Sequence, residues 1–179
     1  MARSEKRVCW DACAWIALIQ DEKILDGEGK LLENRGKMSR GVFELAKRGK
    51  IEIVTSGLSL AEVCKNRSVK EGAPSRVAEV FEHEFVLLAP LDRQIGEKAR
   101  ELMMAGTYFG LKPQDACHLA TAAIVPGVSE LHTFDKKLLD LNHKIERADQ
   151  TMLKICKPHT DTGIDPPLLG AMRADPNGD

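Results

Sequence analysis

Short apolar runs alternate with longer mixed stretches along the chain, and this alternation predicts the layout of the fold. Four apolar runs have the length of buried strands; they cover residues 7–11, 51–56, 85–90 and 130–134. Between and after these runs, the spacing of apolar residues predicts helices, over residues 12–20, 31–47, 59–67, 75–83, 92–109 and 113–125. Strands that alternate with helices pair in parallel, so we expect a three-layer α/β/α sandwich with a mostly parallel central sheet.

The chain changes character near its C-terminal end. The last segment, "KPHTDTGIDPPLLGAMRADPNGD", carries four prolines and three glycines and shows no sustained apolar period. We therefore expect one domain over residues 1–156, a length typical of a single hydrophobic core. An extended or disordered tail is expected over residues 157–179.

Composition narrows the classes of protein that this chain can belong to. The net charge of −1 argues against a protein that binds nucleic acid through its overall charge, so any such partner must meet a local basic patch. No stretch is apolar over the roughly 18 residues that a membrane span needs. The five cysteines form no C-x-x-C pair, so we expect reduced thiols in a cytoplasmic protein that has no membrane partner. Cys156 and His159 lack a second ligand pair nearby in the sequence, which argues against zinc there.

Four acidic residues are predicted to meet at one edge of the sheet. Asp11 and Asp135 end the first and fourth predicted strands, while Glu62 and Asp115 lie in the first turns of two predicted helices. Binding sites in open parallel sheets form beyond the carboxyl ends of the strands. Carboxylates gathered there would raise one another's pKa values, so a cation must hold them. Oxygen-only ligands are the set that Mg²⁺ or Mn²⁺ prefers.

Each acid also has an ordinary structural explanation. Acidic residues favour the first turn of any helix because they offset the positive end of the helix dipole. Asp11 and Asp135 can act as N-caps of the helices that follow them. Ser59 and Glu62 have the three-residue spacing of a capping box. Geometry alone therefore leaves the structural and the functional interpretation of these acids open.

The residues around the four acids are more specific than the acids themselves. The segments "WDACAWIAL", "TSGLSLAEV", "LKPQDACHLATAA" and "LHTFDKKLL" occur in that order within about residues 7–142. They resemble the successive acidic motifs of PIN-domain ribonucleases, and most of all those of the VapC-like toxins of bacterial toxin–antitoxin pairs. One departure from the family pattern is Cys13, because the opening motif of the family often has Ser or Asn there.

This resemblance implies a PIN-like fold and a metal-dependent endoribonuclease. Asp11, Glu62, Asp115 and Asp135 would be the catalytic quartet that binds Mg²⁺ or Mn²⁺, and Thr133 would be a supporting polar residue. Ions held in this way lower the pKa of a bound water and offset charge on a phosphate. The implied reaction is therefore hydrolysis of an RNA phosphodiester bond.

The resemblance also directs attention to binding surfaces. Basic residues near the expected site are candidates for contacts with RNA phosphates; they are Lys65, Arg67, Lys70, Lys136 and Lys137. Each of them can equally belong to a solvated face, and His118, one helical turn after Asp115, can line the site or pack in the core. Proteins of this kind form homodimers and are inhibited by a small antitoxin protein, for which the helices near residues 31–48 and 59–83 are candidate surfaces.

Other classes of protein fit the sequence less well. A haloacid-dehalogenase-type phosphatase needs D-x-D after its first strand, but Asp11 is followed by Ala12 and Cys13. A response-regulator receiver needs an aspartate at the end of its third strand, which here ends in Pro90, and no G-x-G-x-x-G follows the first strand. The remaining alternative is a PIN-like interaction module without catalysis, which would have no reason to keep four clustered acids.

Overall fold

A five-stranded parallel sheet forms the centre of the computed structural model, which describes residues 6–64, 74–105, 108 and 110–161. The strand order is β5-β4-β1-β6-β7, and every neighbouring pair is parallel. The strands are β1 (Arg7–Trp10), β4 (Glu52–Ser56), β5 (Val86–Ala89), β6 (Val128–His132) and β7 (Lys154–Cys156). Four of them coincide with the runs predicted as strands.

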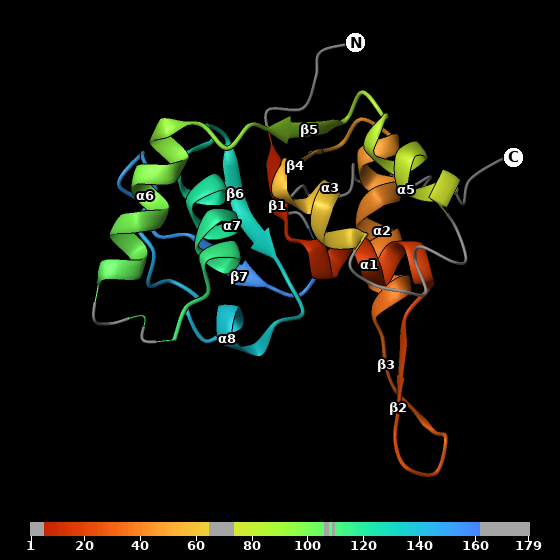
Figure 1. Cartoon of the computed structure of the whole chain (residues 1–179). Coiled ribbons are helices and arrows are strands. Elements are labelled where there is room, and N and C mark those ends of the chain that lie inside the picture. The colour runs from red at the N-terminus through yellow and green to blue at the C-terminus, as the bar shows by residue number, and fades with distance from the viewer. Residues whose placement is uncertain (1–5, 65–73, 106–107, 109, 162–179) are drawn as a thin grey trace, which may run out of the picture.

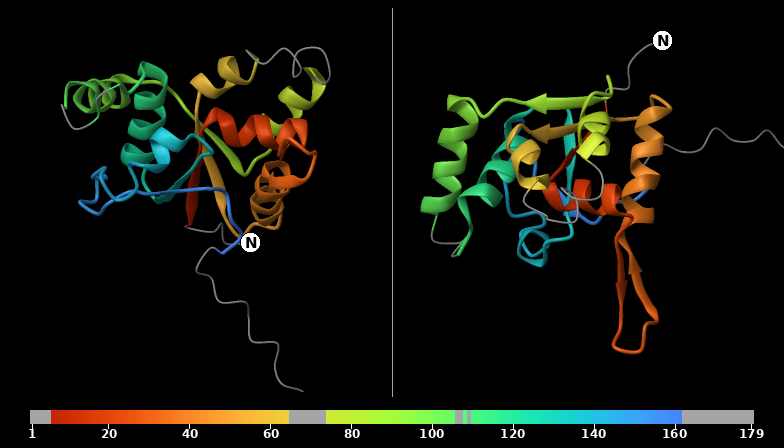
Figure 2. Two further views of the ribbon diagram at one scale, coloured as in Figure 1. Left: turned by 90° about the horizontal axis from the view of Figure 1, so that it is seen from below. Right: turned by 45° about the vertical axis from the view of Figure 1, so that its right-hand side comes forward.

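Helices cover both faces of this sheet and give the expected three layers (Figures 1 and 2). Helices α6 and α7 pack together on one face, and α1, α2 and α5 lie on the other, while α3 and α8 follow strand ends. Their bounds are α1 Ala12–Gln20, α2 Arg35–Lys47, α3 Leu58–Val63, α5 Pro74–Phe81, α6 Arg93–Met104, α7 Pro113–Ile124 and α8 Lys136–Leu139. The α/β/α sandwich predicted from the sequence is thus confirmed.

The central strand β1 is buried on both of its faces, which explains its almost uninterrupted apolar sequence. Val8 and Trp10 point into the core under α1 and α2, where Trp10 packs edge-on against Trp15 with ring centroids 4.6 Å apart. Cys9 points to the opposite face and joins Leu131 and Leu119 in the core under α7. This two-sided burial holds the end of β1, and therefore Asp11, at a defined position.

Two helix starts have the residues that the sequence predicts. The carboxylate of Asp92 accepts a hydrogen bond from the backbone N–H of Ile95 at 2.9 Å and caps α6. Pro113 lies in the first turn of α7, where its missing N–H costs nothing. Within the described ranges, every helix is too short or too polar to cross a bilayer.

Residues 21–34 differ from the expected polar turn and helix start. They form an antiparallel hairpin of β2 (Lys23–Leu25) and β3 (Leu31–Asn34), which projects from the body of the molecule (Figures 1 and 2). Helix α2 begins only at Arg35, because the side chain of Asn34 accepts from the backbone N–H of Lys37 at 2.9 Å and caps it there. The leucines that were assigned to a helix are therefore exposed residues of the hairpin.

The sequence pattern also failed to predict the edge strand β7. This strand has three residues, and Ile155 is the one that is fully buried, so no alternation marks it. Residues 157–161 continue from β7 along the body of the domain, where the Lys157 ammonium lies 2.5 Å from a carboxylate oxygen of Glu33. The remainder of the expected tail, residues 162–179, and the predicted continuation of the helix that starts at 59 lie outside the described residues.

Candidate metal and active site

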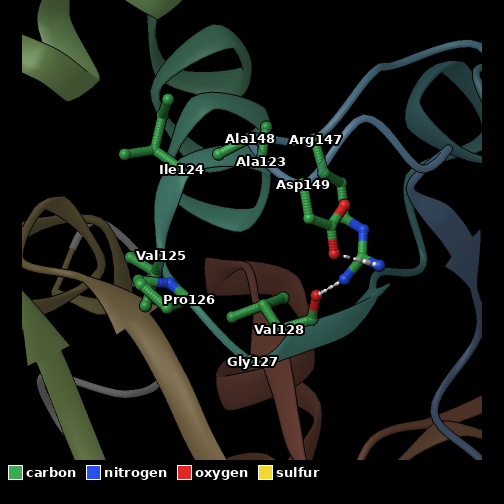
Figure 3. A pocket seen from close by; sticks show the side chains of 9 residues that line it. All are labelled: Ala123, Ile124, Val125, Pro126, Gly127, Val128, Arg147, Ala148 and Asp149. Carbon is green, nitrogen blue, oxygen red and sulfur yellow. Dashed lines mark hydrogen bonds and ion pairs between the residues drawn. The ribbon is translucent and has the colours of Figure 1, made fainter.

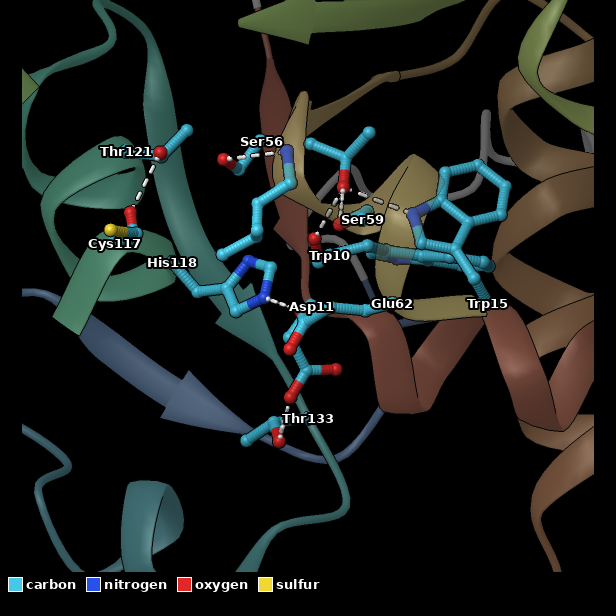
Figure 4. Close-up of polar contacts among 12 residues, drawn as sticks. Trp10, Asp11, Trp15, Ser56, Ser59, Glu62, Cys117, His118, Thr121 and Thr133 are labelled. Atoms are coloured by element: carbon cyan, nitrogen blue, oxygen red, sulfur yellow. Dashed lines mark hydrogen bonds and ion pairs between the residues drawn. The ribbon is translucent and has the colours of Figure 1, made fainter. Parts of the chain in front are cut away.

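Asp11 follows β1 directly and is buried at the carboxyl edge of the sheet, with 2% of its surface exposed. Its Oδ1 accepts from the backbone N–H of Ala14 at 3.1 Å, which confirms Asp11 as the N-cap of α1. Its Oδ2 accepts from the hydroxyl of Thr133 at 2.5 Å (Figure 4). The capping role therefore uses one carboxylate oxygen, and a threonine from β6's carboxyl end orients the other.

Thr133 connects two of the acids. Its hydroxyl donates to Asp11 and accepts from the backbone N–H of Asp135 at 2.9 Å. The Asp135 carboxylate in turn accepts from the backbone N–H of Lys137 at 2.7 Å and caps α8. One buried hydroxyl thus fixes the relative positions of the residues that end β1 and open α8.

The capping box predicted for Ser59 and Glu62 is wrong. Helix α3 begins one residue earlier than expected, at Leu58, and its cap residue Gly57 makes no side-chain capping bond. The Ser59 hydroxyl lies instead 2.8 Å from the hydroxyl of Thr55, in the interior of the protein. A capping box therefore does not account for Glu62.

Glu62 points across to α7 and contacts His118 (Figure 4). Its Oε2 lies 2.6 Å from Nε2 of His118, and the histidine is buried while the glutamate is partly exposed. His118 stands one turn after Asp115 on α7, so it joins the second and third acidic motifs. The sequence left open whether His118 packs in the core or lines the site. In the structure, His118 is buried and also contacts Glu62.

A hydrogen-bond hub at Thr55 holds α3 against β1 and α1. The Thr55 hydroxyl donates to the backbone carbonyl of Trp10 at 2.8 Å and accepts from the indole N–H of Trp15 at 3.1 Å. It also forms a hydrogen bond with the Ser59 hydroxyl at 2.8 Å. Because Ser59 lies one turn before Glu62, this buried hub sets where the Glu62 carboxylate can reach.

Electrostatic couplings link three of the acids, Asp11, Asp115 and Asp135. Burial raises the pKa of Asp11, against the opposing effects of His118 and of the Thr133 hydroxyl. Burial and then the charge of Asp135 raise the pKa of Asp115, while Lys112 and His118 lower it. Burial also raises the pKa of the Cys13 thiol, and the charges of Asp11, Asp135 and Asp115 raise it further.

Three exposed lysines flank this acidic edge. Lys136 and Lys137, both predicted as phosphate contacts, lie in the first turn of α8 beside Asp135. Lys112 precedes α7 and acts on the charge of Asp115. Lys112 was not among the predicted phosphate contacts, although its position immediately before Pro113 and the third acidic motif could have indicated that it lies near the site. The other candidates, Lys65, Arg67 and Lys70, lie outside the described residues.

A hollow of about 250 Å³ opens beside the acidic edge and includes Asp115, Lys137 and Tyr108 in its lining. A second hollow of about 270 Å³ lies at the opposite edge, around the start of β6 (Figure 3). The charged side chains of its lining, Arg147 and Asp149, form an ion pair at 2.9 Å. That second hollow therefore offers no counterpart to the group of acids.

Comparison with known proteins identifies the family of this chain. A family model described as "PIN domain" matches residues 8–144, a segment that contains all four acids. The chain belongs to the PIN-domain family. No curated protein matches the sequence. Among solved structures, this PIN domain is similar to VapC20 of Mycobacterium tuberculosis, described as a Sarcin-Ricin loop cleaving toxin, with 18% identity, a TM-score of 0.52, and coverage of 72% of this chain and 90% of that one.

The donor set of the acidic edge fits a hard divalent cation. The four side chains offer carboxylate oxygens only, which suits Mg²⁺ or Mn²⁺ better than zinc or copper. Asp11 is almost fully buried, and the hydrogen bonds that it accepts compensate only in part for the loss of solvation of its charge. Burying a charge without full compensation is costly, and a cation beside Asp11 would remove that cost.

We predict that Asp11→Asn stabilises the metal-free protein. Because burial raises the pKa of folded Asp11, the stability contributed by its neutral form is present below the unfolded pKa and is lost as the pH rises through the folded pKa. Asparagine can keep the capping bond without this loss. The free energy of unfolding in urea with EDTA at pH 7 should rise relative to that of the wild type.

Asp92→Asn is the matched control, because Asp92 caps α6 through the same bond to the third residue of its helix. Asp92 is exposed, so its substitution should lose only the charge–dipole contribution, about 0.3–1 kcal/mol. The two variants should therefore shift stability in opposite directions. A loss of stability in metal-free Asp11→Asn would contradict the assignment of a buried, uncompensated charge.

Proposed function

We propose that this PIN domain is a Mg²⁺- or Mn²⁺-dependent endoribonuclease that hydrolyses RNA phosphodiester bonds and acts as the toxin of a toxin–antitoxin pair. The observation that carries the proposal is the set of contacts that links the acid-bearing segments: Thr133 joins Asp11 to the backbone of Asp135, and Glu62 contacts His118, one turn after Asp115. In this proposal the ion is bound by Asp11, Glu62, Asp115 and Asp135. The family match and the fold shared with VapC20, whose description names an RNA-cleaving toxin, support the same reaction.

In this proposal the chain's own residues prepare the site before substrate binds. Thr133 orients the Asp11 carboxylate, the backbone N–H of Lys137 holds the Asp135 carboxylate, and His118 contacts Glu62. Three of the four carboxylates therefore have a hydrogen-bonded partner that restricts their rotation. A divalent ion held by these carboxylates would offset charge on the phosphate and lower the pKa of an attacking water. Restricting the ligands in advance reduces the entropy lost when ion and substrate bind.

The surroundings of the quartet are suited to a nucleotide chain. Lys112, Lys136 and Lys137 lie around the acidic edge, where they can contact phosphates without regard to base. The hollow beside Asp115 carries the ring of Tyr108, whose hydroxyl is held by the carbonyl of Lys144 at 2.9 Å. A fixed aromatic ring next to the acids offers a surface on which a base can stack.

The central prediction concerns metal-dependent cleavage and Glu62. Purified protein should cleave structured RNA with Mn²⁺ or Mg²⁺ and stop when EDTA is added. Glu62→Gln keeps the size of the side chain and can still bond His118, but it removes a full charge from the ligand set. We expect cleavage to slow by more than the roughly 10–100-fold that loss of an outer-shell partner costs, and Mn²⁺ to lose most of its stabilising effect on the melting temperature.

Glu97→Gln on α6 is the matched control, since Glu97 is exposed and pairs with Arg93. Its cleavage rate and Mn²⁺ response should equal those of the wild type. Cleavage that continues undiminished in EDTA would overturn the metal assignment. If the folded wild type gained no stability from Mn²⁺, the alternative of a catalytically silent interaction module would hold instead.

We further propose that the protein forms a homodimer, acts in the cytoplasm, and is inhibited by a small antitoxin protein. The support for an interaction surface is the β2–β3 hairpin, on which Leu25, Leu31 and Leu32 are 53%, 50% and 64% exposed. Exposed leucines gathered on a projecting element are typical of surfaces that bind another chain.

The dimer is testable by light scattering at micromolar concentration, where we expect twice the mass of the chain. Leu32→Glu should shift the mass toward the monomer because it buries a charge in the proposed interface. The control is Met104→Glu, because Met104 at the end of α6 is 78% exposed and lies outside the hairpin. This substitution should leave the dimer unchanged. A monomer mass for the wild type over the whole concentration range would refute the dimer.

A further inference from the structure

A second group of ligand-type side chains lies beside the edge strand β7, apart from the four acids. Glu130 and His132 come from β6, Cys156 from β7, and His159 from the segment after β7, and their ligand atoms lie within 4.8 Å of one another. In the parallel register Glu130 pairs with Lys154 and His132 with Cys156, and the adjacency of β6 and β7 is visible in Figure 1. Side chains two residues apart on a strand share a face, so this pairing gathers the group on one side of the sheet.

The spacing of these atoms is close to that of a closed tetrahedral site. Oε2 of Glu130 lies 3.0 Å from Nε2 of His132, 2.9 Å from Nε2 of His159 and 3.7 Å from Sγ of Cys156. Zinc bonds of about 2.0 Å to N or O and 2.3 Å to S place neighbouring ligands roughly 3.3–3.7 Å apart. Small movements of the side chains would therefore convert the present contacts into four bonds to one ion.

The surroundings also favour an ion at this position. Glu130 and His132 are 6% and 1% exposed, and among the described residues no hydrogen-bond partner reaches Nδ1 of His132. The Lys154 ammonium binds Oε1 of Glu130 at 3.1 Å and leaves Oε2 facing the other three residues. A buried carboxylate among two imidazoles and a thiol is a donor set in which the charges of a thiolate and a carboxylate neutralise a divalent cation.

The kind of donor identifies the ion and separates this group from the acidic edge. Two imidazoles, one thiolate and one carboxylate are borderline-soft ligands that Zn²⁺ prefers, whereas Mg²⁺ and Mn²⁺ prefer oxygen alone. Four protein ligands would complete the tetrahedron and leave no open position, which is the pattern of structural zinc sites rather than catalytic ones.

In the sequence, Cys156 and His159 lack a second ligand pair, which argues against zinc there, but the structure supplies that pair. Glu130 and His132 lie more than twenty residues earlier in the chain, and they reach the cluster because β7 pairs with β6. Because the sequence pattern does not mark β7 as a strand, it could not indicate that these four residues meet.

We propose that Glu130, His132, Cys156 and His159 bind one structural zinc ion that fastens β7 and the segment after it to the sheet. The ion would also help to hold Thr133, and through it Asp11, in position. Thr133 follows His132 directly, and its backbone N–H donates to the carbonyl of Cys156 at 3.0 Å. Zinc bonds to His132 and Cys156 would thus fix both strands that hold Thr133 against Asp11. This proposal does not depend on the nuclease activity.

The test is a titration of the reduced, metal-free full chain with Co²⁺, which replaces Zn²⁺ and gives spectra that report its ligands. We expect one equivalent of Co²⁺ to produce the intense visible bands of a tetrahedral site and a thiolate-to-cobalt charge-transfer absorption, and Zn²⁺ to displace it. Cys156→Ser should lose the charge-transfer absorption, while Cys64→Ser and Cys13→Ser should keep it. Circular dichroism of each variant establishes that it is folded.

A second arm separates this site from the acidic quartet. The double variant Glu62→Gln, Asp115→Asn should keep the cobalt spectrum of the wild type even though it removes two ligands of the other site. His159→Gln should weaken Co²⁺ binding and lose the tetrahedral bands in a chain that remains folded. A folded wild type without thiolate charge transfer, or a spectrum unchanged by Cys156→Ser, would overturn the proposal and leave the cluster as a hydrogen-bonded ion pair network.

Discussion

The burial of one carboxylate, that of Asp11, is the constraint on which the rest of the site depends. Asp11 ends the central strand β1, whose side chains are enclosed on both faces, so the fold cannot move this charge toward water without disturbing the core. One of its oxygens caps α1 and the other receives the Thr133 hydroxyl. Those hydrogen bonds fix the orientation of the carboxylate but do not fully stabilise its negative charge, and burial therefore still raises the pKa of Asp11. In the proposed function, a cation bound at the sheet edge would offset the cost of burying this charge.

Two buried threonine hydroxyls connect the core by hydrogen bonds to segments that carry the other acids. Thr55 ties β1 and α1 to Ser59, and so sets the helix that carries Glu62. Thr133 ties Asp11 to the backbone of Asp135. Each hydroxyl joins segments that lie far apart in the sequence, and each is fully buried, so its bonds are not weakened by exchange with water. The acidic edge is therefore a continuation of the core packing, which is how a nuclease site can be held rigid on loops and helix ends.

The architecture could be predicted from the sequence because it follows from local rules, and so could the positions of Asp11 and Asp135 after strand ends. Glu62 was expected in the first turn of its helix but lies near the end of α3. Buried strands such as "RVCW" and "EIVTS" read as apolar runs, and parallel sheets gather strand ends at one edge. The errors occurred where non-local packing decides. The β2–β3 hairpin carries exposed leucines that resemble a helix start, and β7 has a single fully buried residue. The contact between Glu62 and His118 joins residues 56 positions apart, and no spacing rule in one sequence can indicate it.

The most direct test of the account is the pKa of Asp11 itself, measured from the NMR carboxyl carbon shift as a function of pH and assigned by comparison with Asp11→Asn. Without metal, we predict that Asp11 titrates well above the ordinary range of an aspartate, because burial outweighs its hydrogen bonds. With Mg²⁺ added, its titration should move to lower pH, since a bound cation favours the charged form. An ordinary pKa in the metal-free protein, or a raised pKa that Mg²⁺ leaves unchanged, would contradict a metal site built on this buried carboxylate.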